Sequence, residues 1–316
     1  MTRPPGKRTP RTTALVWSGG LAFAVIAVRL IAGRVDGAAL SRSVEAIPDT
    51  PGRATLVFAA FAGAFGLRAL AWSRVLPGLR FRDATAALHV GLAANHVLPL
   101  RMGEAVRPVV AAHRAGVSMQ ATMASTVALR ATDVGALLGL GWLAGPQVIG
   151  SQLGWLSWAA PAALAGSYAV GVRWLGRLPE RRHGLVRLPD LVVLALTCTA
   201  WVLEAVLVWQ SARWAGLSLS ASGAMVVTAA SVAAQVAGLA PGGVGTYEAA
   251  AVAAYVALGF AAGPALVAAL IAHGLTTVYS LATGAVALGA PSLGRLARRR
   301  RPAEAAYPAT NPATIL

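Results

Sequence analysis

The stretch NHVLPLRMGEAVRP, residues 95–108, combines ionisable side chains with helix-breaking residues. It holds two prolines, a glycine, two arginines and a glutamate, yet the whole chain is 57% hydrophobic and only 12% charged. A soluble globular domain carries about 25% charged residues. The low charge predicts a membrane protein. This polar stretch is therefore expected inside the protein or against water, and not against lipid.

Six apolar segments are long enough to cross a bilayer. A spanning α-helix needs about 18 or more apolar residues for a hydrocarbon core of ~30 Å. The segments predict an all-α, polytopic membrane protein, and they cover residues 14–32, 54–73, 118–144, 155–172, 190–209 and 264–290.

The basic residues are distributed unevenly between the loops. The formal net charge is +16. Most basic residues fall before the first segment, after the second, between the fourth and fifth, and after the last. The loops on the opposite side hold only Arg34, Arg42, Arg53 and Arg213. Lys and Arg are enriched in cytoplasmic loops, so both termini are predicted to be cytoplasmic, in a protein of the cell membrane. The same distribution accounts for the charge without a nucleic-acid partner.

The chain is predicted to hold one transmembrane domain, residues 14–290. A basic cytoplasmic segment, residues 1–13, precedes it. A cytoplasmic tail over residues 291–316 follows, first basic and then rich in Pro and Ala.

Two further apolar regions, residues 83–116 and 220–260, are interrupted near their middle. The first arm of the first region, residues 84–98, gives about 22 Å of helix, which is short of a ~30 Å core. Both regions are predicted to be re-entrant helical hairpins, the first open to the cytoplasm and the second to the outside. Two full crossings in each region are the alternative, because they preserve the sidedness of the loops.

The two interruptions have matching residues. Each has a proline, then a glycine, then a glutamate: Pro99, Gly103 and Glu104 in the first, and Pro241, Gly245 and Glu248 in the second. Arg130 follows the first glutamate by 26 residues, and His273 follows the second by 25. This pattern predicts an inverted repeat with halves at about 54–145 and 190–290. Paired Gly/Pro-interrupted segments point to a substrate site in inverted-repeat transporters.

Polar residues near the interruptions are candidates for that site. Interrupted helices leave N–H groups free, and these groups attract anions. A charge at membrane depth costs at least ~2.5 kcal/mol, so it needs a partner or a function. The predicted substrate-binding residues are Asn95, Arg101, Glu104, Arg107, Arg130, Asp133, Gly242, Gly243, Gly245, Glu248 and His273, with Pro99, Gly103 and Pro241 breaking the helices. No metal or cofactor is predicted, since no metal-ligand spacing or nucleotide-binding motif occurs.

Purely structural roles are the alternative for some of these residues. Arg130 and Asp133 lie three apart on one helix face and can pair with each other. Glu104 and Arg101 are a second candidate pair that would hold the hairpin in place. Asn95 is alternatively a hydrogen-bonding residue between helices.

Other polar and aromatic residues have expected positions in the membrane. Arg68 lies near the end of its segment and is predicted to extend its side chain to the interface. Glu204 lies inside the segment 190–209 and needs a partner. Tryptophans that flank the segments, Trp72 and Trp214 among them, are predicted to be interface anchors.

These motifs resemble the transmembrane region of lysylphosphatidylglycerol synthases and related stand-alone flippase-like membrane proteins. The resemblance covers roughly residues 15–290. It rests on N…P-x-R-x-G-E-x-x-R at residues 95–107, R-x-x-D at residues 130–133, and P-G-G-x-G-x-x-E at residues 241–248. In the family a basic residue, usually Arg, tends to stand where this chain has His273. That departure would make a headgroup contact pH-dependent, or remove it.

The resemblance implies movement of lipids between leaflets, or service to lipid-linked glycan pathways. Multidomain members add an aminoacyltransferase domain, for which the short tail leaves no room, so no enzyme activity is expected. The predicted function is translocation of a lipid with a phosphate-containing headgroup, such as an aminoacylated phospholipid or a polyprenyl-phosphate-linked substrate. The alternatives are an integral-membrane lipid-modifying enzyme, or a non-transporting partner of a glycosyltransferase or synthase. The expected partners are membrane lipids and a separate lipid synthase or glycosyltransferase.

Overall fold

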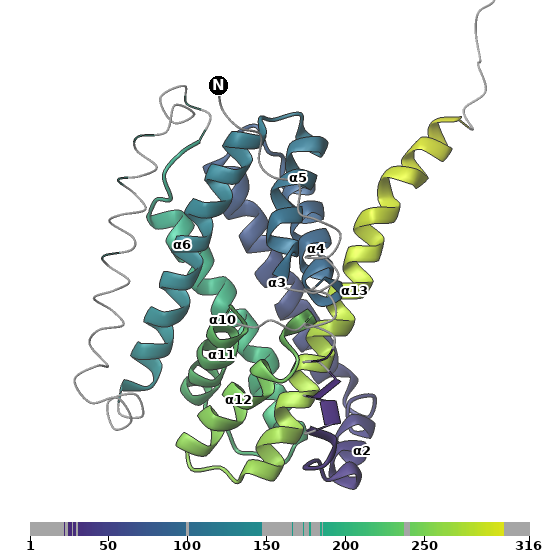
Figure 1. The fold of residues 1–316 in the computed structure, drawn as a ribbon, viewed down its shortest axis with the longest axis vertical. Helices are drawn as coiled ribbons and strands as arrows, with labels where there is room; N and C mark the ends of the chain where they lie inside the picture. Colours follow the sequence, from purple (N-terminus) through teal and green to yellow (C-terminus); the bar gives the residue numbers. More distant parts are fainter. Residues whose placement is uncertain are drawn as a thin grey trace, which may run out of the picture.

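The computed structural model describes residues 31–98, 101–146, 186–236 and 241–299, with isolated positions between residues 22 and 29 and between 166 and 184. The described residues are helical and include no strand, which confirms the all-α prediction. Figure 1 shows the helices as a bundle, in the chain order α2 (Gly37–Glu45), α3 (Pro51–Val75), α4 (Phe81–Val97), α5 (Gly103–Ala115), α6 (Met119–Ala144), α10 (Leu191–Trp214), α11 (Ala221–Val236), the 3-10 turn η3 (Pro241–Gly243), α12 (Thr246–Ala257) and α13 (Ala262–Arg299).

Four described helices are long and apolar enough to cross a membrane. They are α3, α6, α10 and the part of α13 from Ala262 to Gly289. They contain or closely match four of the predicted segments. The other two predicted segments, 14–32 and 155–172, lie outside the continuously described residues.

A polar contact joins the end of α3 to the start of α10. The Asp190 side chain caps α10 by accepting a hydrogen bond from the Val193 N–H at 2.9 Å. Its other oxygen lies 2.7 Å from Nη2 of Arg74. The bond from the Arg74 guanidinium, with the Val193 N–H, holds the pKa of Asp190 at about 2, below its ordinary value. These charged groups lie at the helix ends, as expected for a membrane–water boundary.

The two interrupted regions form pairs of short helices, as predicted. The pairs are α4 with α5, of 17 and 13 residues, and α11 with α12, of 16 and 12 residues. All four helices are shorter than the ~20 residues of a spanning helix. In Figure 1 the α4–α5 pair lies in the upper half of the bundle and the α11–α12 pair in the lower half. Gly103 begins α5, Pro241 begins η3, and Pro99 lies outside the described residues.

Helix contacts follow an internal symmetry. Helix α3 packs on α4 as α10 packs on α11, and α5 packs on α6 as α12 packs on α13. Between the halves, α4 packs on α13 as α11 packs on α6, while α3 and α10 pack on each other. Exchanging the two halves therefore preserves these contacts, which supports the predicted repeat, whereas the packing of α10 on α6 has no counterpart of similar extent between α3 and α13.

Small residues lie at equivalent contacts between the halves. A Cβ built on Gly141 of α6 would lie 2.6 Å from the Ala229 Cβ of α11. A Cβ built on Gly284 of α13 would lie 2.3 Å from the Ala93 Cβ of α4. Small residues let membrane helices approach closely where no hydrophobic effect drives them together. The two contacts bring α11 against α6 and α4 against α13.

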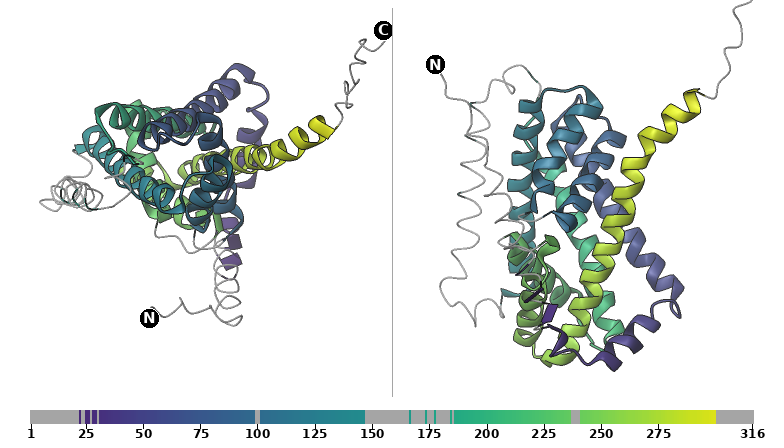
Figure 2. Two further views of the ribbon diagram at one scale, coloured as in Figure 1. Left: turned by 90° about the horizontal axis from the view of Figure 1, so that it is seen from above. Right: turned by 45° about the vertical axis from the view of Figure 1, so that its right-hand side comes forward.

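Two features differ from the sequence-based prediction. Helix α2 was not predicted, because its nine residues are too few for a span; Asp36 caps it through a bond from the Ala39 N–H at 3.0 Å. Helix α13 continues to Arg299, past the predicted start of the tail at residue 291. Its last turns are rich in Ala, Leu and Arg, which favour helix. Figure 2 shows this end of α13 projecting from the bundle.

Candidate functional site

A charged cavity of about 120 Å³ lies between the two halves. A water molecule needs roughly 10–15 Å³ of such space, so the cavity accommodates several waters or one small polar group. It is too small for a whole lipid. Four arginines and three carboxylates line it, which leaves a formal charge of +1: Arg68, Arg101, Arg107 and Arg130 against Glu104, Asp133 and Glu204.

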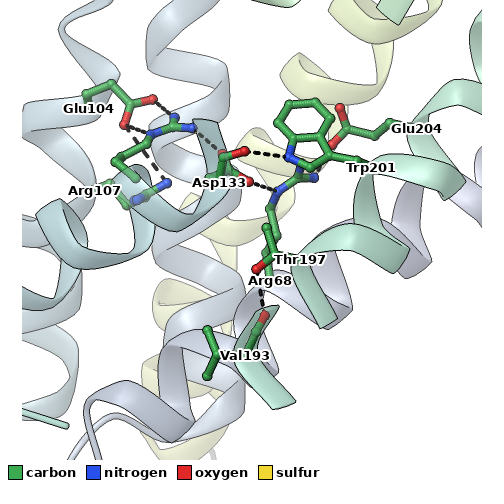
Figure 3. Close-up of polar contacts among 9 residues, drawn as sticks. Arg68, Glu104, Arg107, Asp133, Val193, Thr197, Trp201 and Glu204 are labelled. Carbon is green, nitrogen blue, oxygen red and sulfur yellow. Dashed lines mark hydrogen bonds and ion pairs between the residues drawn. The ribbon is translucent and has the colours of Figure 1, made fainter. Parts of the chain in front are cut away.

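A chain of ion pairs runs along the cavity wall and links four helices (Figure 3). Glu204 on α10 accepts a hydrogen bond from Arg68 on α3, whose Nε lies 3.3 Å from Oδ1 of Asp133 on α6. Nη1 of Arg130, also on α6, donates to Oδ2 of Asp133 at 2.7 Å. Arg130 then pairs with Glu104 on α5, with 2.7 Å between its Nε and Oε2 of the carboxylate. The predicted pair of Arg130 with Asp133 is confirmed.

Arg68 does not reach the membrane interface, so its predicted position is wrong. Its side chain is only 12% exposed and pairs with two carboxylates. Its guanidinium also lies over the Trp201 ring, 4.3 Å from the centroid. The prediction used distance from the segment end alone, whereas α3 continues to Val75 and neighbouring helices supply acidic partners. Glu204 thereby has the partner that its depth requires.

Glu104 and Arg101 do not form the predicted pair. Glu104 bonds to Arg130, accepts from Nδ2 of Asn95 at 3.2 Å and lies 4.0 Å from Nη1 of Arg107. Arg101 makes no ion pair within the described part of the chain, although it lines the cavity. It is therefore the cavity cation whose charge no close carboxylate neutralises.

Further polar groups in the cavity wall lack partners. The Nε of Arg107, Nε2 of His96 and Oδ1 of Asn95 are buried and have no hydrogen-bond partner among the described residues. His96 uses Nδ1 as donor to the Leu92 carbonyl at 3.0 Å, so its Nε2 is left for the cavity. Buried polar atoms normally have partners, so these three atoms are positions in the wall that could bond to a polar group in the cavity.

His96 was not predicted as a site residue. The motif beside it begins at Asn95, and a single histidine next to that motif carries no spacing signal.

Two tryptophans predicted to lie at the interface are buried. Trp72 is 1% exposed; its Nε1 donates to Ser125 at 3.0 Å, and the Arg107 guanidinium lies over its ring. Trp214 is also buried, at 8% exposure. Tryptophans near segment ends here pack between helices.

The second interruption is a glycine turn held by hydrogen bonds. Gly242, Gly243 and Gly245 have φ angles of 66°, 77° and 87°, a left-handed conformation that residues with a Cβ rarely adopt. Glu248 accepts from the Gly245 N–H at 2.7 Å, which caps the start of α12. Gln235 of α11 donates to the Gly242 carbonyl at 3.1 Å, so its bond lies within the hairpin. Gly242 lines the cavity and brings this turn into its wall.

Glu248 and His273 lie behind that turn. Nδ1 of His273 lies 2.6 Å from Oε1 of Glu248, and its Nε2 lies 3.0 Å from the Gly242 carbonyl oxygen. The pair mirrors the other half of the molecule, where Glu104 pairs with Arg130. In each half, the glutamate after the interruption bonds to a residue of the last long helix of that half.

The predicted site thus divides into two parts. Asn95, Arg101, Glu104, Arg107, Arg130, Asp133 and Gly242 line the cavity together with Gly103. Gly243, Gly245, Glu248 and His273 belong to the hydrogen-bonded cluster behind Gly242. Across the described ranges, no group of three or more His, Cys, Asp and Glu side chains is arranged to hold a metal ion.

Fold and site define a polytopic α-helical membrane protein in which two interrupted helix pairs enclose a charged cavity. The model of the family described as the lysylphosphatidylglycerol synthase TM region matches residues 17–284, and the chain belongs to this family. The resemblance seen in the motifs is thereby confirmed, and it relates the protein to lipid handling. A search of curated proteins gives no match to the chain.

Proposed function

We propose that the protein translocates a lipid with a phosphate-containing headgroup across the cell membrane. The observation that carries the proposal is the cavity with a formal charge of +1, in which Arg101 has no ion-pair partner among the described residues. Charges inside a membrane protein are costly, and they are kept where they serve a substrate or ion path. Membership of a family related to lipid handling supports a lipid as that substrate.

The proposal treats both helix pairs as re-entrant. Their longest arm, α4, has 17 residues, about 26 Å at 1.5 Å per residue, and is short of a ~30 Å core. The two interruptions also meet, because a Cβ on Gly242 would lie 3.4 Å from the His96 ring near the end of α4. In this proposal the arms enter from opposite sides and meet at their tips, so the cavity would lie at mid-depth. Inverted-repeat transporters bind their substrates at this depth.

The unpaired donors suit a phosphate group. Phosphate oxygens accept charge-assisted hydrogen bonds from guanidinium groups, often two at a time. Arg101 and Nε of Arg107 offer such bonds from two positions around the cavity. Nε2 of His96 can accept a bond from a headgroup hydroxyl or amine, because its Nδ1 carries the ring hydrogen. The cavity volume of about 120 Å³ fits the polar part of a headgroup, so the acyl chains remain in the bilayer.

The formal charge of the cavity suits a headgroup that contains one phosphodiester. A phosphodiester carries one negative charge and would neutralise the formal +1 of the wall. An aminoacylated phospholipid adds a cationic amine, which leaves the filled cavity positive and which would share the Glu104 carboxylate, 32% exposed, with Arg130. A polyprenyl-phosphate-linked substrate with a higher negative charge would leave the cavity negative.

The test is leaflet exchange of fluorescent phosphatidylglycerol and lysylphosphatidylglycerol in proteoliposomes. We compare the wild type with Arg101→Gln and with Arg74→Gln, which makes the same change at an exposed ion pair outside the cavity. Hydrogen bonds to charged groups contribute about 1.5–3 kcal/mol. We therefore expect exchange to fall about 10-fold or more in Arg101→Gln and to be retained in Arg74→Gln.

Three outcomes would contradict the proposal. Equal exchange in both variants would remove Arg101 from the lipid path. A chemically altered lipid in the mass spectrum would indicate a lipid-modifying enzyme. Lipid bound through Arg101 without any exchange would indicate a non-transporting partner of a synthase or glycosyltransferase.

A further inference from the structure

The cluster behind the cavity wall is built from Glu248, His273 and the Gly242 carbonyl. We propose that it is a proton-binding site in which His273 is an imidazolium, and that proton release loosens the glycine turn beside the cavity. The consequence for transport rests on the proposed function, whereas the proton site itself does not.

Both ring nitrogens of His273 face hydrogen-bond acceptors. Nε2 lies 3.0 Å from the Gly242 carbonyl oxygen, which cannot donate a hydrogen. Nδ1 lies 2.6 Å from Oε1 of Glu248. A neutral imidazole carries hydrogen on only one nitrogen, whereas the imidazolium donates from both. With Glu248 ionised, both contacts are therefore hydrogen bonds only when the ring holds the second proton.

The position of Glu248 in the first turn of α12 favours its anionic form, because the N-terminal end of a helix stabilises a negative charge. Its Oε2 accepts from the Gly245 N–H at 2.7 Å, so both carboxylate oxygens face donors. Glu248 is 3% exposed and His273 is 5% exposed. A buried carboxylate without a counter-charge is strongly unfavourable. His273 supplies that counter-charge when it is protonated.

The symmetry of the molecule gives an independent reason for a cation at this position. Glu104, the equivalent glutamate, pairs with Arg130, which is always charged. Histidine differs because its charge changes in the physiological pH range when it is unperturbed. Glu248 and His273 thus correspond to Glu104 and Arg130, except that His273 can release its proton.

The described groups around His273 add no second counter-ion. From α12 it faces Glu248 and the Tyr247 ring, 4.8 Å between centroids; from α4 it faces His96, 6.3 Å between centroids. From η3 it meets only the Gly242 carbonyl. The described residues of α10 and α2, which also pack on α13, form no ion pair with it. The negative charge of Glu248 therefore balances the positive charge of the protonated His273 ring.

Loss of the proton removes one of the two hydrogen bonds. The proton leaves from Nε2 to water, and the electron pair that stays on the nitrogen then faces the Gly242 carbonyl oxygen. The turn that this bond holds contains three left-handed glycines, and Gly242 lines the cavity. Proton release is thereby coupled to the shape of the cavity wall. In a lipid translocator, this coupling would allow a proton gradient to drive headgroup movement.

The test uses full-length protein with ¹⁵N-labelled histidine in lipid nanodiscs. NMR reports whether each ring nitrogen carries hydrogen, and His273→Arg identifies the His273 signals by their loss. Should His273→Arg not fold, His273→Gln provides the assignment. We expect both nitrogens of His273 to be protonated at pH 7, the second proton to be lost at alkaline pH, and the ring to be neutral at pH 7 in Glu248→Gln.

A second readout is amide hydrogen exchange of residues 241–248 across the same pH range. Relative to His273→Arg, which keeps a permanent donor, the wild-type turn should exchange about fivefold faster once the proton is lost, the effect of one hydrogen bond. A neutral His273 ring at pH 7 would overturn the proton site. A charged ring with exchange that matches His273→Arg at every pH would overturn the coupling.

Both readouts are independent of lipid movement. A doubly protonated ring in a protein that exchanges no lipid would refute the proposed function and leave the proton site in place. Lipid exchange by a protein whose His273 ring is neutral at pH 7 would support the proposed function and refute the proton site.

Discussion

Arg101 is held in a backbone conformation that is unfavourable for a residue with a Cβ. Its φ angle is 51°, the one positive value for a non-glycine residue in the described part of the chain. The left-handed conformation costs such a residue roughly 1–2 kcal/mol. Strain of this kind persists at functional sites, where the surrounding structure enforces it. Here it places a cation without an ion-pair partner at the cavity, between α4 and α5.

Replacing Arg101 by glycine and by alanine separates this strain from the function of the side chain. Both variants lack the guanidinium, so both should lose headgroup-selective lipid exchange. Glycine adopts positive φ freely, so Arg101→Gly should be more stable to unfolding than Arg101→Ala by about 1 kcal/mol. Thermal unfolding in detergent measures the difference. Equal stability, or a more stable alanine variant, would show that the left-handed conformation is not present in the folded protein.

Most charged residues of the cavity could be predicted from the sequence, but of their ion pairs only that of Arg130 with Asp133 could. A charge in an apolar segment is conspicuous, which is why Glu104, Arg130 and Asp133 were identified. The partners of Arg68 come from α6 and α10, and their approach depends on how these helices pack. His96 carries no distinctive spacing, and its free Nε2 is known only once its Nδ1 is seen to bond to a backbone carbonyl.

At the level of elements, Gly103 matters for a close contact as well as for the helix break. It is the first residue of α5, and a Cβ there would lie 2.0 Å from the Gly91 carbonyl oxygen of α4. It would also lie 2.5 Å from Oδ1 of Asn95, a group of the cavity wall. The two arms of the first hairpin therefore touch through backbone at this point. The glycine and proline pattern predicted where the hairpins break, whereas this contact depends on how α4 and α5 lie in three dimensions.

Gly103→Ala should destabilise the protein by about 1–3 kcal/mol or more, because backbone must move to admit the methyl group. Gly139→Ala in α6 is the matched control, since a Cβ there meets nothing within 4 Å. The control should be neutral, or more stable by up to about 1 kcal/mol, since alanine favours helix over glycine. Unfolding midpoints of the two variants, measured in one detergent, compare them directly. Similar midpoints would contradict the close approach of α4 and α5.

At the scale of the whole molecule, helices α3 to α6 pack on helices α10 to α13 through the α3–α10, α4–α13 and α6–α11 contacts. Within the described residues, two ion pairs join the halves: Arg68 with Glu204, and Arg74 with Asp190. The first pair lies in the cavity wall and the second at the helix ends. The matching Pro, Gly and Glu residues predicted the repeat, but neither ion pair between the halves could be predicted, because each depends on the packing of α3 on α10.

The two links should differ in their contribution to stability. Removing one partner of a buried ion pair costs about 3–5 kcal/mol, since the other charge remains in a poorly solvated site. Exposed pairs contribute about 0–1 kcal/mol. The Arg68 and Glu204 side chains are each 12% exposed, against 46% for both Arg74 and Asp190. We therefore expect Glu204→Gln to lower the free energy of unfolding by about 3 kcal/mol, the lower end of the range, because Asp133 remains beside Arg68.

Asp190→Asn is the matched control for this comparison. It also neutralises one carboxylate between the halves, and asparagine still caps a helix well, so the loss should be at most about 1 kcal/mol. Glu204→Gln has a further consequence, because it raises the formal charge of the cavity from +1 to +2. Anionic lipid should then bind more tightly to the variant, in an assay that separates binding from exchange. Equal destabilisation by both substitutions, with unchanged lipid affinity, would mean that Glu204 is solvated and does not belong to the wall of a buried, charged cavity.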